Sequence, residues 1–516
     1  MKSFKLALLA LFINVSVFSQ QYSIVKGTGF TPPDASKWGG FAGENDDSFF
    51  ILRIKTRGKG TTYYIESISK KTREKQFEVE LPLEKEADVA LDPVYLDMRL
   101  FCANQRIFVF FKGQSKSDKN VKYFMKTVFA DGKLGDMVEI LNTAEKVDLN
   151  FYQSPDKTKI LILQDNPWVE QRQMSEAILY EASTFKKVWS KKLPSEYKSS
   201  VMESYFYNLD NQGNLYFLFN YLEDADAKKV GTGVGVLSDK AEKAKMLPLP
   251  NKNNYTIENG RAKVTSDGKL VFTGLYKFLP KKDEQRYKEL SKKERVVYDK
   301  ELEAQKEIGF FCYYFDKDAF TVSADFKKFP EEVAKKLDYA GGLLTFGAAN
   351  KYYSASGLVE VQGEFYMIEN HKYTISGDGV ATFEREFIIS KIGKKGQILW
   401  TKIYPKFTQN NLNTFNILVK GDKMYLFYLE HPKNLENSTV DTYNEMKYSN
   451  IGNYNGSVMV ALEIASDGSA KRDKVFENKG WCYDPQPFNI LLEGGNSLLL
   501  RMINKDQERF DVLKVD

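Results

Sequence analysis

Residues 150–164 read NFYQSPDKTKILILQ: an apolar stretch, a tight polar turn around Pro155 and Asp156, and a second apolar run over Lys159–Gln164. Proline fixes its own backbone angle, and short polar side chains bond to neighbouring amides, so this composition sets a turn directly. Two apolar stretches joined in this way predict an antiparallel pair of strands.

Runs of the same kind recur along the whole chain, each just after a polar turn. Together with Lys159–Gln164 they are Phe49–Ile54, Arg106–Phe111, Asn214–Phe219, Lys269–Gly274, Glu364–Glu369, Lys423–Tyr428 and Ser497–Met502. Their starts are 57, 53, 55, 55, 95, 59 and 74 positions apart, in chain order. Eight units at a near-constant period, with two expansions, indicate a repeat array.

Each unit also repeats an internal order of strands. A third strand follows the run, then a hairpin turn such as Ala130–Lys133, then a fourth strand such as Val188–Leu193. Four antiparallel strands per unit predict an all-β protein, a single β-propeller. Eight blades fit the count best, with seven blades, a solenoid or two stacked sandwiches as alternatives.

Two units carry a more specific turn. Ser154–Leu161 and Ser266–Phe272 resemble the Ser-Pro-Asp-Gly-Lys signature that joins a turn to a strand in WD-like propeller repeats. The Trp-Asp ending of true WD repeats is absent. The resemblance implies a propeller and no particular activity, because such repeats serve binding, scaffolding and catalysis alike.

The chain ends suggest how the ring closes. The last unit runs out after its third strand, Phe510–Val515, and Tyr22–Val25 near the other terminus is a spare strand. We therefore expect the N-terminal strand to complete the last blade.

One segment departs from the β pattern. Residues 281–307 hold nine basic and eight acidic residues around a thin apolar stripe at helical spacing. The pattern predicts a solvated helical insertion, with a partner-binding helix as the alternative.

The first 19 residues have the pattern of a secretory signal peptide. Lys2 and Lys5 precede the apolar run Leu6–Val17, which is too short to span a bilayer. No cysteine follows the run, so a lipid anchor is not expected. We expect residues 20–516 to be one propeller domain without a transmembrane segment, exported to the periplasm or the extracellular space.

The composition limits the classes of partner that the protein is expected to bind. The formal charge of +5 is small for 516 residues and is spread along the chain, which disfavours a nucleic-acid partner. Three cysteines allow at most one internal disulfide. Cys102 and Cys312 lie in apolar runs and should be buried, whereas Cys482 should be the more exposed thiol.

Few residues are suited to catalysis. His371 and His431 are the only histidines, and neither lies in a nucleophile motif or at metal-binding spacing. The acidic turns Glu44–Asp47 and Glu223–Asp226 lack the spacing of a calcium loop. No metal or cofactor is therefore expected.

The candidate ligand-binding residues are Trp168, Glu369, His371, Glu430 and His431. Both histidines follow second strands of neighbouring units, so they should lie on one face of the ring. Trp168 should lie in a long loop on that face, and the loops predicted for 369–384 and 430–454 should lie on the same face. Long loops on a rigid scaffold commonly carry binding groups.

These features favour an exported binding or scaffold protein with a protein or glycan partner. A hydrolase or lyase that acts on glycans or peptides through carboxylates is the alternative. The sequence leaves open whether the protein is an enzyme.

Overall fold

The fold is known from a computed structural model of the chain. It describes residues 22–32, 36–57, 60–91, 98–103, 105–117, 120–143, 147–165, 175–193, 203–224, 229–251, 255–265, 267–278, 280–333, 353–376, 380–409, 415–435, 449–450, 456–484, 492 and 497–516. The proposed signal peptide lies outside these residues.

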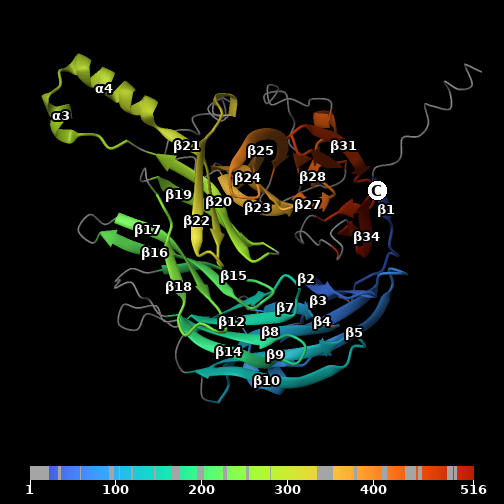
Figure 1. Cartoon of the computed structure of the whole chain (residues 1–516). Coiled ribbons are helices and arrows are strands. Elements are labelled where there is room, and N and C mark those ends of the chain that lie inside the picture. Colours follow the sequence, from blue (N-terminus) through green and yellow to red (C-terminus); the bar gives the residue numbers. More distant parts are fainter. Residues whose placement is uncertain are drawn as a thin grey trace, which may run out of the picture.

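The described strands form eight blades in a ring, as the repeat predicts (Figure 1). Blade 1 consists of β2 (Ser36–Glu44), β3 (Ser48–Arg57), β4 (Gly60–Ser69) and β5 (Lys75–Leu81), and blade 2 of β7 (Met98–Ala103), β8 (Arg106–Ser115), β9 (Val121–Phe129) and β10 (Leu134–Thr143). Blade 3 consists of β11 (Asp148–Gln153), β12 (Lys159–Asp165), β13 (Ser175–Glu181) and β14 (Lys186–Leu193), and blade 4 of β15 (Glu203–Leu209), β16 (Leu215–Asp224), β17 (Lys229–Leu237) and β18 (Lys245–Pro248).

Blade 5 consists of β19 (Thr256–Val264), β20 (Lys269–Phe278), β21 (Glu307–Asp316) and β22 (Thr321–Lys328), and blade 6 of β23 (Tyr353–Val361), β24 (Glu364–Ser376), β25 (Val380–Ile392) and β26 (Ile398–Gln409). Blade 7 consists of β27 (Phe415–Lys420), β28 (Lys423–Glu430), β30 (Val458–Ile464) and β31 (Ala470–Glu477), and blade 8 of β32 (Cys482–Tyr483), β33 (Ser497–Asn504), β34 (Gln507–Val515) and β1 (Tyr22–Val25). Short elements lie between them: α2 (Leu83–Ala87), β6 (Val89–Ala90), η1 (Pro432–Leu435) and β29 (Ser449–Asn450), which pairs with β26 in parallel.

Each of the recurring apolar runs forms the second strand of a blade. Alternate side chains of a strand point to opposite faces, so a second strand serves two interfaces at once. In β3, Phe49 and Ile51 pack toward blade 8, whereas Phe50 and Leu52 pack toward blade 2. Burial on both faces explains why the runs are continuously apolar rather than alternating.

The ring closes as the chain ends suggest. β1 pairs with β34 in antiparallel register, Tyr22 opposite Val515 and Val25 opposite Val512. The dark-blue β1 lies beside the red β34 in Figure 1. Tyr22 is buried with Leu513 and Val515, so the N-terminal strand belongs to the core of the last blade.

Because successive strands of a blade run antiparallel, the connections between them emerge alternately on the two faces of the ring. Turns from first to second and from third to fourth strands lie on one face, which we call the short-turn face. Second-to-third connections and links between blades lie on the other, the long-connection face. The longest connections, 279–306, 329–352 and 431–457, belong to the long-connection face.

One expectation about loops is wrong. Residues 369–384 are not a loop, because β24 continues to Ser376 and β25 begins at Val380; the two strands form an extended hairpin. The short-turn face also has one long connection, 484–496, between β32 and β33.

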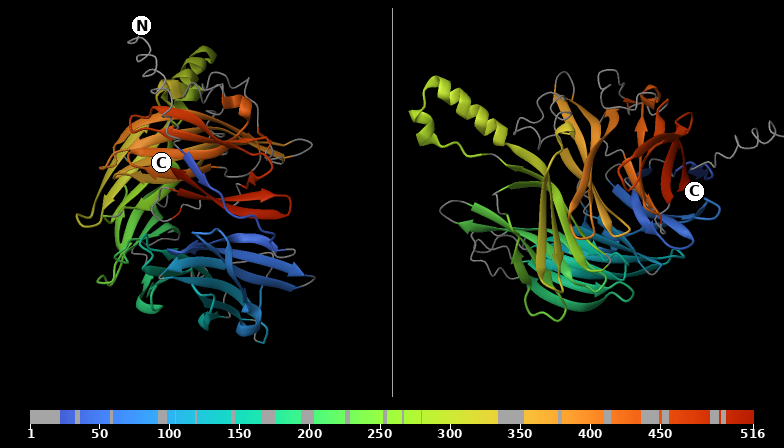
Figure 2. Two further views of the ribbon diagram at one scale, coloured as in Figure 1. Left: turned by 90° about the vertical axis from the view of Figure 1, so that its right-hand side faces the viewer. Right: turned by 45° about the horizontal axis from the view of Figure 1, so that its top comes forward.

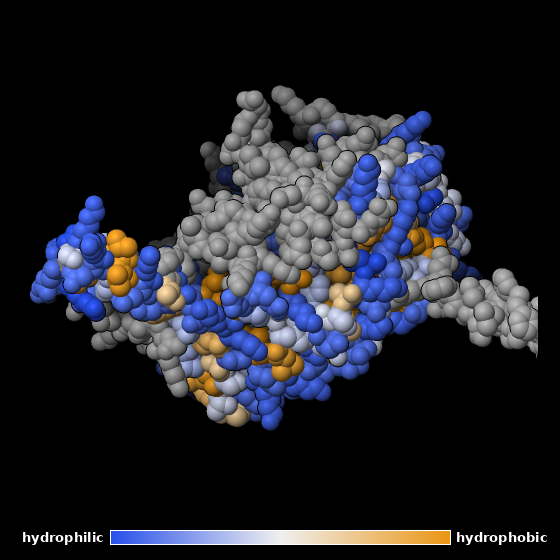
Figure 3. Space-filling view, turned by 90° about the horizontal axis from the view of Figure 1, so that it is seen from above, coloured by the Kyte–Doolittle hydropathy of each residue, from blue (hydrophilic) through white to orange (hydrophobic). Residues whose placement is uncertain are grey.

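The helical insertion is confirmed. Within it, α3 (Glu284–Glu289) and α4 (Lys292–Gln305) form an arm between β20 and β21. The arm projects from the ring in every view (Figures 1, 2 and 3). In the described part of the chain no helix is long and apolar enough to cross a membrane.

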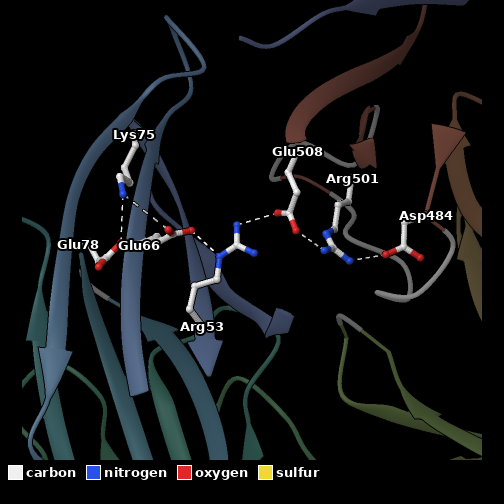
Figure 4. A network of polar contacts seen from close by, with 7 residues as sticks. All are labelled: Arg53, Glu66, Lys75, Glu78, Asp484, Arg501 and Glu508. Carbon is white, nitrogen blue, oxygen red and sulfur yellow. Dashed lines mark hydrogen bonds and ion pairs between the residues drawn. The ribbon is translucent and has the colours of Figure 1, made fainter. Parts of the chain in front are cut away.

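A chain of charged side chains joins blades 8 and 1 across the point of closure (Figure 4). Arg53 is fully buried; its Nε donates to Glu66 Oε2 at 2.6 Å and its Nη2 to Glu508 Oε2 at 2.8 Å. Arg501 bonds to Glu508 and to Asp484. Burial by itself would raise the pKa of Glu508, but Arg53 and Arg501 together hold it below its ordinary value.

The three cysteines remain thiols, and Cys102 and Cys312 are buried as expected. Cys482 is half-buried and is the most accessible of the three. Burial raises the pKa of the Cys482 thiol.

Candidate functional site

Four of the five candidate ligand-binding residues lie on or directly after the second strands of blades 6 and 7. β24 and β28 run in the same direction, toward the long-connection face. His371 lies within β24, opposite Tyr353 of β23, and His431 directly follows β28. The backbone thus brings both histidines toward the same face of neighbouring blades.

Glu430 ends β28 and organises the turn that follows. Its Oε1 accepts hydrogen bonds from Asn434 Nδ2 at 2.7 Å and from the backbone N–H of His431 at 3.1 Å. Its Oε2 accepts from the Phe407 N–H at 3.2 Å and pairs with Arg472 Nη2 at 3.1 Å. One buried carboxylate therefore ties β26, β28, β31 and η1 together.

Glu430 is fully buried, and burial raises its pKa to about 7. Arg472 and the hydrogen-bond donors act in the opposite direction, but desolvation outweighs them. The Glu430 carboxyl consequently changes its charge near neutral pH.

A second buried ion pair lies at the same interface between blades. Lys406 of β26 bonds to Glu384 of β25, and Thr408 Oγ1 donates to Glu384 Oε2 at 3.2 Å. The Lys406 ammonium also lies 4.9 Å from the centre of the Phe387 ring and 5.2 Å from that of Phe415. Contact with the negative faces of aromatic rings helps to hold a desolvated cation.

Sequence reasoning missed Glu384, Lys406 and Arg472. One signal was present for Lys406, which interrupts the apolar run from Ile403 to Phe407. The partner of a buried charge cannot be found by spacing alone, because Arg472 comes from a strand 42 residues beyond Glu430.

Glu369 lies at a different interface. Phe365 and Met367 of β24 pack against blade 5, whereas Tyr366 and Ile368 pack against blade 7. Because alternate side chains of a strand point to opposite faces, Glu369 faces blade 5, as Phe365 and Met367 do. There the positive charge of Arg261, in β19, acts to lower the pKa of Glu369. Glu369 and Glu430 therefore do not form one site, because the sheet of blade 6 separates them.

Glu369 and its neighbour Asn370 are both fully buried. Within the described ranges, neither the Glu369 carboxylate nor the Asn370 amide has a hydrogen-bond partner. Burial raises the pKa of Glu369 well above its ordinary value, against the attraction of Arg261. Burial therefore favours the protonated form of Glu369.

Trp168 lies outside the described residues, in the connection between β12 and β13. Its role in binding stays a prediction.

A cavity of about 200 Å³ opens on the short-turn face. It lies among the first turns of blades 1, 2 and 3. The residues that line it are Glu44, Asn45, Asp46, Cys102, Ala103, Gln105, Asp156 and Lys157. The sequence indicates only an acidic turn at Glu44–Asp47, and no spacing in it indicates that three separate turns converge.

Two of the carboxylates that line this cavity, those of Glu44 and Asp156, are engaged in local contacts. Glu44 Oε2 lies 2.5 Å from Lys70 Nζ. Asp156 Oδ1 accepts from Ser154 Oγ at 2.6 Å and from the Thr158 N–H at 3.0 Å. Burial raises the pKa of Asp156, but these donors outweigh burial and lower it overall. Among the described residues, no group of three His, Cys, Asp or Glu side chains could hold a metal ion.

Comparison with known proteins adds similarity of fold only. No family model and no curated protein matches the sequence. The chain is similar to the Dos1 propeller, at 10% identity over 95% of each chain with a TM-score of 0.40. It is also similar to the polysaccharide lyase Uly1, at 11% identity over 85% of this chain and 96% of the other, with a TM-score of 0.39.

Prolyl oligopeptidase B from Galerina marginata matches at 8% identity, over 92% of this chain and 56% of the other, with a TM-score of 0.37. Identity this low does not transfer an activity. The WD-like character of residues 154–161 and 266–272 stays a resemblance.

Proposed function

We propose that this chain is an exported binding or scaffold protein whose long-connection face contacts a protein or glycan partner. The unequal distribution of connections carries the proposal. The three longest, 279–306, 329–352 and 431–457, all emerge on that face. Long connections on a rigid ring are the usual place for recognition groups.

The buried charges of blades 6 and 7 support a binding role. Glu384 is paired with Lys406, and Glu430 with Arg472. Each pair lies inside the interface, where it fixes the strands from which the hairpin 376–380 and the connection 431–457 begin. The pairs serve to position the long-connection face rather than to perform chemistry on a substrate.

A carboxylate-based hydrolase or lyase has less support. Glycoside hydrolysis needs a protonated carboxyl beside a second carboxylate. In the described cavity, Asp156 has a lowered pKa and Glu44 is paired with Lys70, so neither is arranged as a proton donor.

The proposal can be tested by blocking each face in turn. Lys433, in η1, is exposed on the long-connection face, and Lys394, in the turn between β25 and β26, is exposed on the short-turn face. In a Cys482→Ser background, Lys433→Cys and Lys394→Cys would each be coupled to a maleimide polyethylene glycol. Binding would be measured to the strongest ligand of a glycan and peptide array.

We expect the label at position 433 to weaken binding at least tenfold, because it occupies the approach to blades 6 and 7. The label at position 394 should leave binding within twofold. Equal effects at the two positions, a larger effect at 394, or no binding to any array member would contradict the proposal.

A further inference from the structure

The arm formed by α3 and α4 carries an outward surface that the ring does not use. Figure 3 shows hydrophobic side chains on the arm, bounded by hydrophilic ones, at a distance from the ring. Val296 and Val297 of α4 are 53% and 56% exposed, the highest values among the large exposed hydrophobic side chains in the described part of the chain.

The inward surface of the arm makes its own contacts. Tyr298 of α4 is buried, and its hydroxyl accepts from the backbone N–H of Asp283 at 3.1 Å. Tyr287 Oη donates to Asp299 Oδ2 at 2.9 Å, and Arg295 lies over the Tyr287 ring. These contacts hold α3 against α4, so the arm is ordered without support from the outward surface.

Helical geometry places a separate set of residues on the outward surface. Side chains three or four positions apart share one side of a helix. Starting from Lys293, that side holds Val296, Val297 and Lys300, and Glu301 borders it. Lys293, Lys300 and Glu301 are exposed and make no hydrogen bond or ion pair in the part of the chain that the structure describes.

The charges are arranged symmetrically about Val297. Lys293 and Glu301 each lie four residues from it, on opposite sides, and Glu294 and Lys300 each lie three residues from it. In an antiparallel pair of identical helices centred on Val297, Lys293 of one copy would face Glu301 of the other. Lys300 would likewise face Glu294. The surface is thus complementary to itself.

We propose that α4 is a dimerisation surface, on which a second copy of this chain docks antiparallel about a two-fold axis at Val297. A two-fold contact uses the same patch on both partners, which self-complementary charges satisfy. Because the arm stands away from the ring, two copies could meet at their arms. The valines would supply the apolar centre and the charges would set the direction.

The dimer should be weak. One pair of helices buries less than the roughly 1,200 Å² at which specific stable interfaces begin. Sedimentation equilibrium of the mature chain, at concentrations rising from micromolar to about a millimolar, would detect it. We expect a reversible monomer–dimer equilibrium.

Val296→Glu combined with Val297→Glu should weaken dimerisation at least tenfold, because four carboxylates would meet at the centre. Val188→Glu is the matched control, since Val188 is 45% exposed on an outer strand. The control should dimerise as the unchanged chain does. Circular dichroism would confirm that each variant keeps its strand content.

Exchanging the charges at positions 293 and 301 distinguishes pairing of two copies through this surface from other effects of the substitutions. Lys293→Glu would set two carboxylates against each other at each end of the helix pair, and Glu301→Lys would set two ammonium groups against each other there. Each single variant should therefore dimerise at least threefold more weakly. The double variant should recover, and so should an equimolar mixture of the two single variants, in which each chain complements the other.

Three results would overturn the proposal: a chain that stays monomeric at every concentration, a dimer unaffected by the valine substitutions, or single variants whose mixture does not recover.

Discussion

Deletion of residues 510–516 is expected to leave the chain unable to fold. The deletion removes most of β34, which pairs with β33 on one side and with β1 on the other. It takes away four buried apolar side chains: Phe510, Val512, Leu513 and Val515. Burial of each contributes about 1.5–3 kcal/mol as an upper estimate. Their sum is comparable with the roughly 5–15 kcal/mol that stabilises a typical protein.

The loss also reaches the N-terminal strand. Without β34, β1 loses its neighbour in the last blade, and the bond from the Gly27 N–H to Asp511 Oδ1 at 2.9 Å disappears. The measurement is the yield of soluble protein and its thermal unfolding. Substitution of the exposed Asp516 by Ala should leave both unchanged. A soluble truncated chain with an unaltered melting temperature would contradict this role for β34.

Arg53→Met should lower the free energy of unfolding by about 3–5 kcal/mol, because it removes the central cation from a buried network. Arg53 and the Glu66 side chain are both fully buried, and Arg53 also contacts Glu508 of blade 8. The substitution leaves Glu66 with Lys75 Nζ, at 3.9 Å, as its remaining cation in the network. The substitution also removes the contacts of the guanidinium with the rings of Phe30 and Trp38.

Urea unfolding would measure the change. Lys75→Met is the matched control: Lys75 belongs to the same network but is 38% exposed, so its removal should change stability by less than about 1 kcal/mol. Arg53→Met combined with Glu66→Leu should recover part of the loss, since it leaves no unpaired carboxylate at that position. Equal effects of the two single substitutions would show that burial does not control the network.

The architecture could be predicted because its determinants are local. Each second strand contains a predominantly apolar run, as in Ile160–Leu163, and each run is preceded by a polar turn. Closure could be predicted for a similar reason, since a missing fourth strand at one end and a spare strand at the other are both visible in the sequence.

The candidate site could be predicted only in part. The direction of β24 and β28 follows from the repeat, so the shared face of His371 and His431 could be anticipated. The side toward which Glu369 points could not be anticipated, because it depends on strand register. A shift of one residue moves every side chain of the strand to the opposite face. The same applies to the hairpin of β24 and β25, where Lys372 to Ser376 continue the pairing beyond the apolar run.

Contacts between distant segments were beyond prediction altogether. Arg53 meets Glu508 through the arrangement of blades in space. The cavity on the short-turn face likewise requires three turns from three blades. No period or motif in the sequence encodes which turns converge.

The most direct test of the closed ring is a disulfide between its two ends. Ser23 of β1 is opposite Lys514 of β34, and paired positions of neighbouring strands fall within the reach of a disulfide. In a Cys482→Ser background, Ser23→Cys with Lys514→Cys should oxidise to a linked species, identified by mass spectrometry of the joined peptides. Ser23→Cys with Lys505→Cys, in the turn at the far end of β34, should remain reduced. Absence of the 23–514 link, or equal linking of both pairs, would contradict closure by the N-terminal strand.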